Sequence, residues 1–136
     1  MRQQFKTARC ILYHDGSYLL AVHSSFWGSK RPRWGLPGGR IERGESPETA
    51  ILRELEEELE VRLGGVMEVG PFPYKRALHM VYAAYLEGDI DNYDNMELLD
   101  IGWFSEADVV TLRDRGELHA NYELEAIRAL AQMLEP

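Results

Sequence analysis

The stretch Gly38–Val61, which reads GGRIERGESPETAILRELEEELEV, constrains the fold of this chain more than any other segment. Its second half has the periodicity of an amphipathic helix. At about 100° per residue, one arc of that helix holds the apolar residues Ile51, Leu52, Leu55 and Leu59. Ser46 suits the N-cap, and Pro47 suits the first helical position, where no backbone donor is needed. The sequence therefore predicts a core-facing helix that begins directly after Ser46.

A neighbouring arc of the same helix is acidic. Glu54, Glu57 and Glu58 stand at positions i, i+3 and i+4, where side chains are neighbours. Like charges at this spacing destabilise a helix, and a divalent cation removes the repulsion because clustered carboxylate oxygens are the ligands that magnesium prefers. Gly38 and Gly39 lie in the preceding loop, where backbone can approach a phosphate or a metal closely. The alternative interpretation is a solvated acidic helix after an ordinary turn.

The spacing favours the first interpretation. Five residues separate Gly39 from Glu45, and seven more separate Glu45 from the run Arg53-Glu54-Leu55, which Glu57 and Glu58 follow. This pattern resembles the signature box of the Nudix (MutT-like) hydrolases. One position differs, because the family usually has glycine where this chain has Glu60. A glutamate would be strained in a left-handed helix end, so we expect the helix to run on toward Gly64.

The resemblance implies roles for the box residues. Glu57 and Glu58 would be metal ligands, and Glu54 would be a ligand or the general base. The metal would be Mg²⁺ or Mn²⁺, and a backbone carbonyl of Gly38 or Gly39 would complete its coordination. Arg53 and Glu45 are expected to form a pair that orients the loop against the helix and so supports catalysis.

A further metal-binding carboxylate often comes from the loop before the final strand in this family. Glu97 stands where the MutT branch carries such a glutamate, with Asp94 and Asp100 as rivals. All three residues could instead be loop residues that only contact solvent. The sequence leaves this choice open.

Two segments are candidates for substrate binding. The irregular stretch before the box holds Trp27, Arg31 and Arg33, a mixture that can stack a base and hold phosphate. The alternative is a flexible surface loop whose cations offset nearby acidic residues. Ala120-Asn121 resembles an Ala-Asn pair in the branch that cleaves oxidised guanine nucleotides, so Asn121 would read the base. Its alternative role is a helix N-cap.

The resemblance implies an enzyme that cleaves a pyrophosphate linkage in a nucleoside diphosphate derivative. The first choice is a normal or oxidised nucleoside triphosphate, cleaved to the monophosphate and pyrophosphate. The alternatives within the family are nucleotide sugars, dinucleotides and capped RNA. Two alternatives from other classes are a Nudix-like domain that binds nucleotide without cleaving it and a protein-interaction domain that docks through the acidic arc.

Length and composition agree with a small-molecule enzyme. The 136 residues predict one domain, 1–136, without a signal peptide or membrane span. The net charge of −8 argues against general nucleic-acid binding. The single cysteine, Cys10, cannot form an internal disulfide, so we expect a buried thiol and a cytoplasmic protein. A homodimer is allowed by the sequence but not specified.

Strand and helix patterns complete the predicted fold. We expect strands over residues 7–13, 18–23, 66–69, 78–86 and 101–104, with turns at Asp15-Gly16 and 71–73. Ser105 is expected to cap a short helix over 106–111, and a terminal helix is expected over 121–134. Periodicity alone indicates a mixture of α and β structure. The resemblance implies an α/β/α sandwich, in which helices flank a mixed β-sheet.

Overall fold

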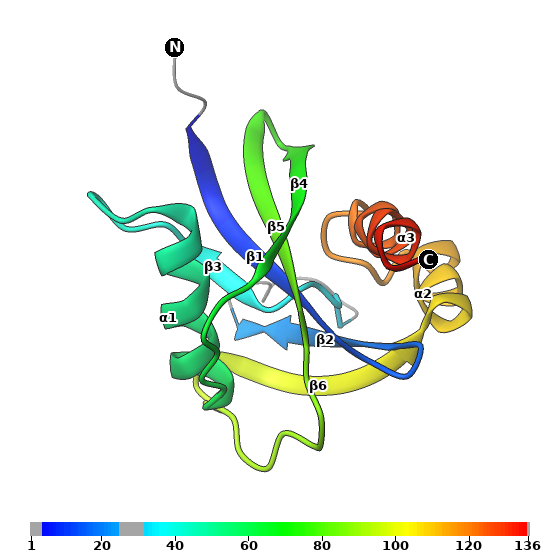
Figure 1. Ribbon diagram of the computed structural model, residues 1–136. Helices are drawn as coiled ribbons and strands as arrows, with labels where there is room; N and C mark the ends of the chain where they lie inside the picture. The colour runs from blue at the N-terminus through cyan, green and yellow to red at the C-terminus, as the bar shows by residue number, and fades with distance from the viewer. Residues whose placement is uncertain (1–3, 25–31, 136) are drawn as a thin grey trace.

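A computed structural model of the chain describes residues 4–24 and 32–135. Within these ranges it has six strands and three helices (Figure 1). In chain order they are β1 Phe5–His14, β2 Ser17–His23, β3 Gly38–Arg40, α1 Pro47–Leu59, β4 Met67–Tyr74, β5 Ala77–Tyr85, β6 Leu98–Ser105, α2 Glu106–Asp114 and α3 Glu123–Leu134.

The strands form one mixed sheet in the order β4-β5-β1-β2-β6, and β3 pairs with β1 outside this path. β1 and β5 are parallel, while the other pairs are antiparallel. β1 changes neighbour along its length: Thr7 pairs with Arg40 of β3, whereas Tyr13 pairs with Tyr18 of β2. The sheet therefore splits beside the N-terminal half of β1, next to the loop that precedes α1.

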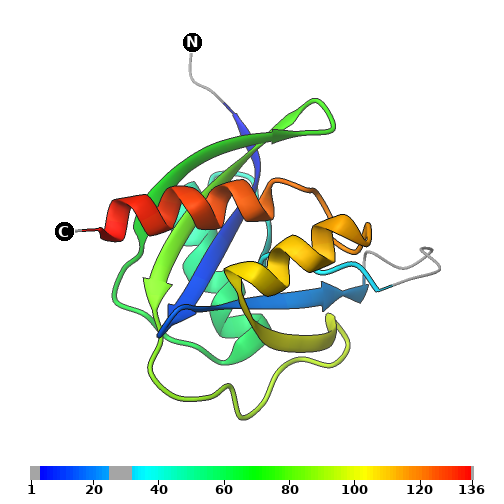
Figure 2. The same cartoon turned by 90° about the vertical axis from the view of Figure 1, so that its right-hand side faces the viewer.

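Helices cover both faces of the sheet, as the α/β/α prediction required. α1 lies on one face, and α2 and α3 lie on the other (Figures 1 and 2). Successive side chains of β1 point to opposite faces of the sheet, so β1 contributes to the core on each face. Cys10 and Leu12 pack in the core under α1, whereas Ile11 packs in the core under α3. Each large apolar side chain buried in this way contributes about 1.5–3 kcal/mol. Cys10 is a buried free thiol, and burial raises its pKa well above the usual range.

The start of α1 and the first hairpin agree with the sequence. The Ser46 hydroxyl accepts a hydrogen bond from the Thr49 amide at 3.1 Å, and Pro47 is the first helical residue. Asp15 and Gly16 both have positive φ angles of 46° and 75°, which is the conformation of a tight hairpin turn. Ser105 caps α2 in a reciprocal capping box with Asp108, although α2 continues to Asp114, beyond the predicted end.

The prediction that α1 runs on toward Gly64 is wrong. The helix ends at Leu59, and Glu60 itself takes the left-handed conformation, with φ 56° and ψ 32°. The Glu60 amide donates to the Glu56 carbonyl at 3.1 Å, and the Val61 amide donates to the Leu55 carbonyl at 3.2 Å. These capping bonds, together with the burial of Val61, offset the cost of about 1–2 kcal/mol for a left-handed residue with a side chain.

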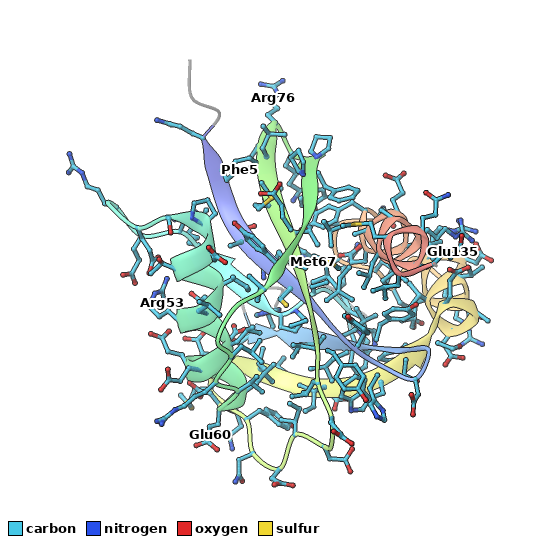
Figure 3. The ribbon with its side chains drawn as sticks, in the orientation of Figure 1. Phe5, Arg53, Glu60, Met67, Arg76 and Glu135 are labelled. Carbon is cyan, nitrogen blue, oxygen red and sulfur yellow. The ribbon has the colours of Figure 1, made fainter. Side chains whose placement is uncertain are left out.

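The turn predicted at residues 71–73 is also wrong. Pro71 and Pro73 lie inside β4, opposite Met80 and Leu78 of β5. β4 is at the edge of the sheet, where a residue without an amide donor can be accommodated. The chain turns instead at Lys75 and Arg76, whose φ angles are 48° and 62°. Figure 3 shows Arg76 at the tip of this hairpin.

Asn121 does not cap the terminal helix. α3 begins at Glu123, and Asn121 lies before it with φ 66°, a conformation that asparagine tolerates better than most residues. β6 begins at Leu98, within the stretch predicted as loop, because its residues pair with β2. None of the helices in the described ranges is both long enough and apolar enough to cross a lipid bilayer.

Candidate active site

A cavity of about 400 Å³ lies beside the split in the sheet. Its walls come from α1, from β1 to β5, and from the loops that precede β6 and α3. The acidic part of the lining consists of Glu54 and Glu58 of α1 and Glu97 of the loop before β6. Gly38 and Gly39 lie in β3 and not in a loop as expected, because they pair with β1. They contact Glu58 and Glu54 respectively, so β3, α1 and the cavity meet at one place.

Glu58 is held at both oxygens. It is only 2% exposed, although it stands on a strongly acidic helix. The Gly38 amide donates to Oε1 at 3.1 Å, and His23 Nε2 lies 3.1 Å from Oε2. A buried carboxylate needs such partners, because desolvation without them would cost several kcal/mol. The local structure thus fixes the Glu58 carboxylate at the edge of the cavity.

Glu54 is the second glutamate of α1 at the cavity. Burial, together with the neighbouring charge of Glu58, raises its pKa to about 7, although the Arg53 charge acts in the opposite direction. Gly39 approaches it so closely that a Cβ at that position would lie 2.7 Å from the Glu54 carboxylate. Only a glycine therefore fits at position 39 without displacing Glu54. A carboxyl group with a pKa near 7 can exchange a proton at neutral pH.

Arg53 connects several acceptors around the box. Its Nε and Nη2 donate to the two oxygens of Glu45 at 2.7 and 2.9 Å, and Nη2 also donates to the Arg40 carbonyl at 3.2 Å. Nη1 donates to Glu54 Oε1 at 3.1 Å. The hydrogen bonds from Arg53 hold the pKa of Glu45 below its ordinary value. Figure 3 shows Arg53 on the side of α1. The loop before α1 is therefore tied to the helix through this one guanidinium.

The other predicted acidic ligands lie in different surroundings. The Glu57 side chain is 58% exposed and accepts from Arg53 Nη1 at 3.2 Å, outside the cavity lining. Glu97 lines the cavity, whereas its rivals do not. Asp94 Oδ1 accepts from the Met96 amide, and Asp100 Oδ1 accepts from the amide of the next residue. The structure thus brings Glu54, Glu58 and Glu97 to one cavity and leaves Glu57 at its margin.

The donor set of the cavity fits a hard divalent cation. Within residues 4–24 and 32–135, no three Asp, Glu, His or Cys side chains are already arranged as a metal cluster. Glu54 and Glu58 nevertheless provide paired carboxylates whose mutual repulsion contributes to the raised Glu54 pKa. A cation between them would remove that repulsion, and oxygen ligands suit Mg²⁺ and Mn²⁺. The Gly38 carbonyl, one of the two backbone oxygens expected to complete the coordination, already accepts a hydrogen bond from Arg9 Nη1 at 2.9 Å.

The other charged and aromatic residues of the cavity lining are mostly cations and rings. Lys6, Arg9, Arg40 and Lys75 line the cavity together with Tyr74, His79 and His119. The Tyr74 and His119 rings are 5.6 Å apart, and the Tyr74 hydroxyl donates to the His119 carbonyl. Burial, assisted by the nearby positive charge of Arg9, lowers the pKa of His119 to about 4. This imidazole is therefore neutral at physiological pH, and the charge of these residues comes from the lysines and arginines.

The predicted substrate-binding residues do not lie together in the cavity lining of the described structure. Trp27 and Arg31 lie outside the described residues. Arg33 is exposed and is not part of the cavity lining, although its charge contributes to the lowered pKa of His119. Asn121 is exposed and is not part of the cavity lining.

Sequence reasoning missed the residues that the strands bring to the cavity. His23, Tyr74, His79 and His119 come from four separate segments and have no mutual spacing that a linear pattern could show. One signal was available for His79: it is a polar residue within an otherwise apolar strand. It is buried, and its Nδ1 lies 2.6 Å from Thr7 Oγ1.

Comparison with known proteins decides the family. A family model described as the NUDIX domain matches residues 4–125. The chain belongs to the Nudix hydrolase family. The nucleoside triphosphatase NudI of Enterobacter sp. (strain 638) is 32% identical over 128 residues, which cover 82% of this chain and 89% of that protein. This Nudix chain is accordingly a pyrophosphohydrolase.

Solved structures agree with the fold of this Nudix domain. The MutT NUDIX hydrolase of Burkholderia pseudomallei has a TM-score of 0.65 and 25% identity, covering 78% of this chain and 87% of that one. The NUDIX domain of Shewanella oneidensis NrtR, solved with ADP-ribose, has a TM-score of 0.74 at 24% identity. That match covers 99% of this chain and 91% of the NrtR domain.

Proposed function

We propose that this Nudix hydrolase cleaves nucleoside triphosphates to the monophosphate and pyrophosphate with Mg²⁺ or Mn²⁺. The supporting observation is the composition of the cavity lining. It contains three carboxylates, Glu54, Glu58 and Glu97, together with cations and aromatic rings. A nucleoside triphosphate has the complementary parts, an anionic chain and an aromatic base. The similarity to the NudI nucleoside triphosphatase supports the same substrate class.

The acidic part would carry the reaction. Glu54, Glu58 and Glu97 would hold the metal, which when bound neutralises phosphate oxygens and lowers the pKa of water. Glu57 remains a proposed ligand from the family pattern. Glu54 Oε1 accepts from Arg53, which leaves Oε2 to take a proton from the attacking water. Arg53 and Glu45 act by holding the loop before α1 in place.

The remaining residues would bind the substrate. Lys6, Arg40 and Lys75 supply positive charge for phosphate oxygens. Tyr74 and the neutral His119 present aromatic surface and hydrogen-bonding groups to the base. Arg33, Trp27 and Arg31 remain proposed contacts from the neighbouring segment. Base reading by Asn121 would require a change in its position, since it lies outside the cavity lining.

The alternative substrate is a nucleotide sugar or a dinucleotide, which has the same diphosphate with a second group attached. The NrtR domain solved with ADP-ribose motivates this alternative. A non-catalytic nucleotide-binding role is disfavoured, because Glu54 and Glu58 are both present and both line the cavity.

A substrate panel tests the proposal. The purified protein is incubated with nucleoside triphosphates, nucleotide sugars and dinucleotides, with magnesium, with manganese and with EDTA. We expect metal-dependent release of pyrophosphate from at least one triphosphate at a higher kcat/KM than for any other class. Preferential cleavage of a nucleotide sugar would replace the substrate assignment. Nucleotide binding without turnover of any compound would overturn the catalytic proposal.

Four further properties also remain proposals. We propose that residues 1–136 act as one domain. The buried thiol of Cys10 supports a reducing, cytoplasmic setting. A homodimer is compatible with the chain, and analytical ultracentrifugation would establish the oligomeric state. The net charge of −8 supports a preference for small substrates over nucleic acid.

A further inference from the structure

His23, from a strand outside the box, contacts a carboxylate of the box at the cavity. It is the last residue of β2, and its side chain is 5% exposed, while that of Glu58 is 3% exposed. His23 Nε2 lies 3.1 Å from Glu58 Oε2. The opposite oxygen, Oε1, accepts from the Gly38 amide at 3.1 Å. The imidazole and the amide therefore hold the carboxylate from two directions.

Backbone bonds join the same three segments. The Ser24 amide, directly after His23, donates to the Glu97 carbonyl at 2.8 Å. The Asp94 amide donates to the Glu58 carbonyl, also at 2.8 Å. The end of β2, the loop before β6 and α1 are thus connected at one corner of the cavity. The position of His23 is fixed relative to both Glu58 and Glu97.

We propose that His23 is a positioning residue for the metal site, and that it holds the Glu58 carboxylate in the orientation that binds the cation. An ionised carboxylate can only accept, so the proposal requires the imidazole form that carries a proton on Nε2, which donates to Glu58 Oε2. The inference rests on the proposed function, in which Glu58 is a metal ligand. It adds a residue from outside the box to that site.

The physical reason is the flexibility of glutamate. A free glutamate side chain samples many rotamers, and ordering it costs free energy when a metal binds. Hydrogen bonds that fix a ligand carboxylate beforehand remove this cost, and losing such an outer partner typically costs about 10–100-fold in metal affinity. Gly38 alone leaves Oε2 without this restraint. We expect His23 to supply the restraint.

A pair of substitutions separates hydrogen bonding from packing. In His23→Gln the amide nitrogen takes nearly the place of Nε2 and can still donate, whereas His23→Met fills similar volume without a donor. The readout is the Mn²⁺ dissociation constant, measured on the free enzyme from the electron paramagnetic resonance signal of unbound Mn²⁺. We expect about a 10–100-fold weaker affinity for His23→Met, and nearly wild-type affinity for His23→Gln. His14→Met is the matched control, because His14 contacts Asp15 at the surface, away from the cavity.

Combination with Glu58→Gln makes the test specific to this pair. If His23 acts through Glu58, His23→Met causes no further loss of Mn²⁺ affinity in a Glu58→Gln background. Wild-type Mn²⁺ affinity in His23→Met, while Glu58→Gln loses it, would overturn the positioning role alone. Wild-type affinity in Glu58→Gln would overturn the metal assignment and the positioning role together. If His23→Met does not fold, His23→Asn replaces it, because its shorter amide does not reach Oε2.

Discussion

Arg53 and Glu45 form a two-pronged ion pair, in which Nε and Nη2 of the guanidinium donate to the two oxygens of one carboxylate at 2.7 and 2.9 Å. The pair joins α1 to the loop that precedes it. Because the same guanidinium also contacts Glu54, it couples the shape of that loop to the position of a carboxylate in the cavity. The planar fork of arginine is required for this geometry, and a lysine ammonium cannot reproduce it.

Arg53→Lys is therefore expected to damage both stability and activity. It keeps the charge but removes the fork, so Glu45 loses one or both of its charge-assisted hydrogen bonds. We expect the free energy of unfolding to fall by about 1–3 kcal/mol, with a lower kcat at saturating metal. Urea unfolding and steady-state kinetics measure the two effects. A variant that matches wild type in both would show that the pair does not orient the loop.

Glu123 predicts an unusual pH dependence of stability. It is 1% exposed, its Oε2 accepts from the Ala120 amide at 2.9 Å, and its Oε1 has no hydrogen-bond partner among the described residues. Burial raises its pKa from 4.5 to about 7. The folded protein therefore keeps the proton up to about pH 7, whereas the unfolded chain releases it near 4.5. Between these values the folded state binds more protons, so stability falls as pH rises.

Glu123→Gln is expected to remove the contribution of Glu123 to this dependence, while the raised pKa of Glu54 leaves a second contribution of the same sign. Glutamine resembles the protonated acid, and its carbonyl can still accept from the Ala120 amide. We expect similar unfolding free energies for variant and wild type near pH 4.5, and a variant more stable by about 3 kcal/mol above pH 7. Urea unfolding at several pH values measures the difference. A constant difference across this range would mean that Glu123 does not titrate as proposed.

Glu60→Gly tests the helix end. Glu60 has a positive φ, which costs about 1–2 kcal/mol for a residue with a side chain. Glycine avoids this cost, but it loses more conformational entropy on folding, which cancels part of the gain. We expect a net gain of about 0.5–1 kcal/mol in unfolding free energy, with unchanged kinetics. Gly64, which is exposed and has no positive φ, provides the control position. Destabilisation by Glu60→Gly would show that the side chain makes a favourable interaction larger than the strain.

Tyr74 tests the aromatic part of the cavity. Removing its ring in Tyr74→Leu is expected to raise KM for the preferred nucleotide by about 10–100-fold, since stacking on a base is worth about 1–3 kcal/mol. Tyr74→Phe keeps the ring and loses only the hydroxyl that donates to the His119 carbonyl, so KM is expected to stay close to wild type. Equal KM values for wild type and Tyr74→Leu would place the base elsewhere.

The sequence predicted what local chemistry determines. The cap at Ser46 and the buried face of α1 depend on spacing within one helix, and both are present, although Leu52 of the predicted apolar arc is only half-buried. The five expected strand ranges each overlap an observed strand. The errors arose where tertiary contacts outweighed local preference. Pro71 sits in a strand because that strand is at the sheet edge, and Glu60 ends the helix because capping bonds compensate for its strain.

The cavity could be predicted only in part for the same reason. Glu54 and Glu58 follow from the helical pattern, and Glu97 follows from the family resemblance. The partners that control them come from distant segments. His23 meets Glu58 only because β2 ends beside α1, and the neutral state of His119 depends on burial and on the charge of Arg9. Neither relationship has a signature along the chain.

The products formed from a nucleoside triphosphate test the central claim most directly. Phosphorus-31 nuclear magnetic resonance can follow a mixture of the common nucleoside triphosphates with magnesium, comparing wild type with Glu58→Gln. We predict that wild type forms nucleoside monophosphate and pyrophosphate, and that Glu58→Gln is slower by orders of magnitude because an anionic metal ligand is lost. Formation of nucleoside diphosphate and orthophosphate, or an equal rate in Glu58→Gln, would contradict the account.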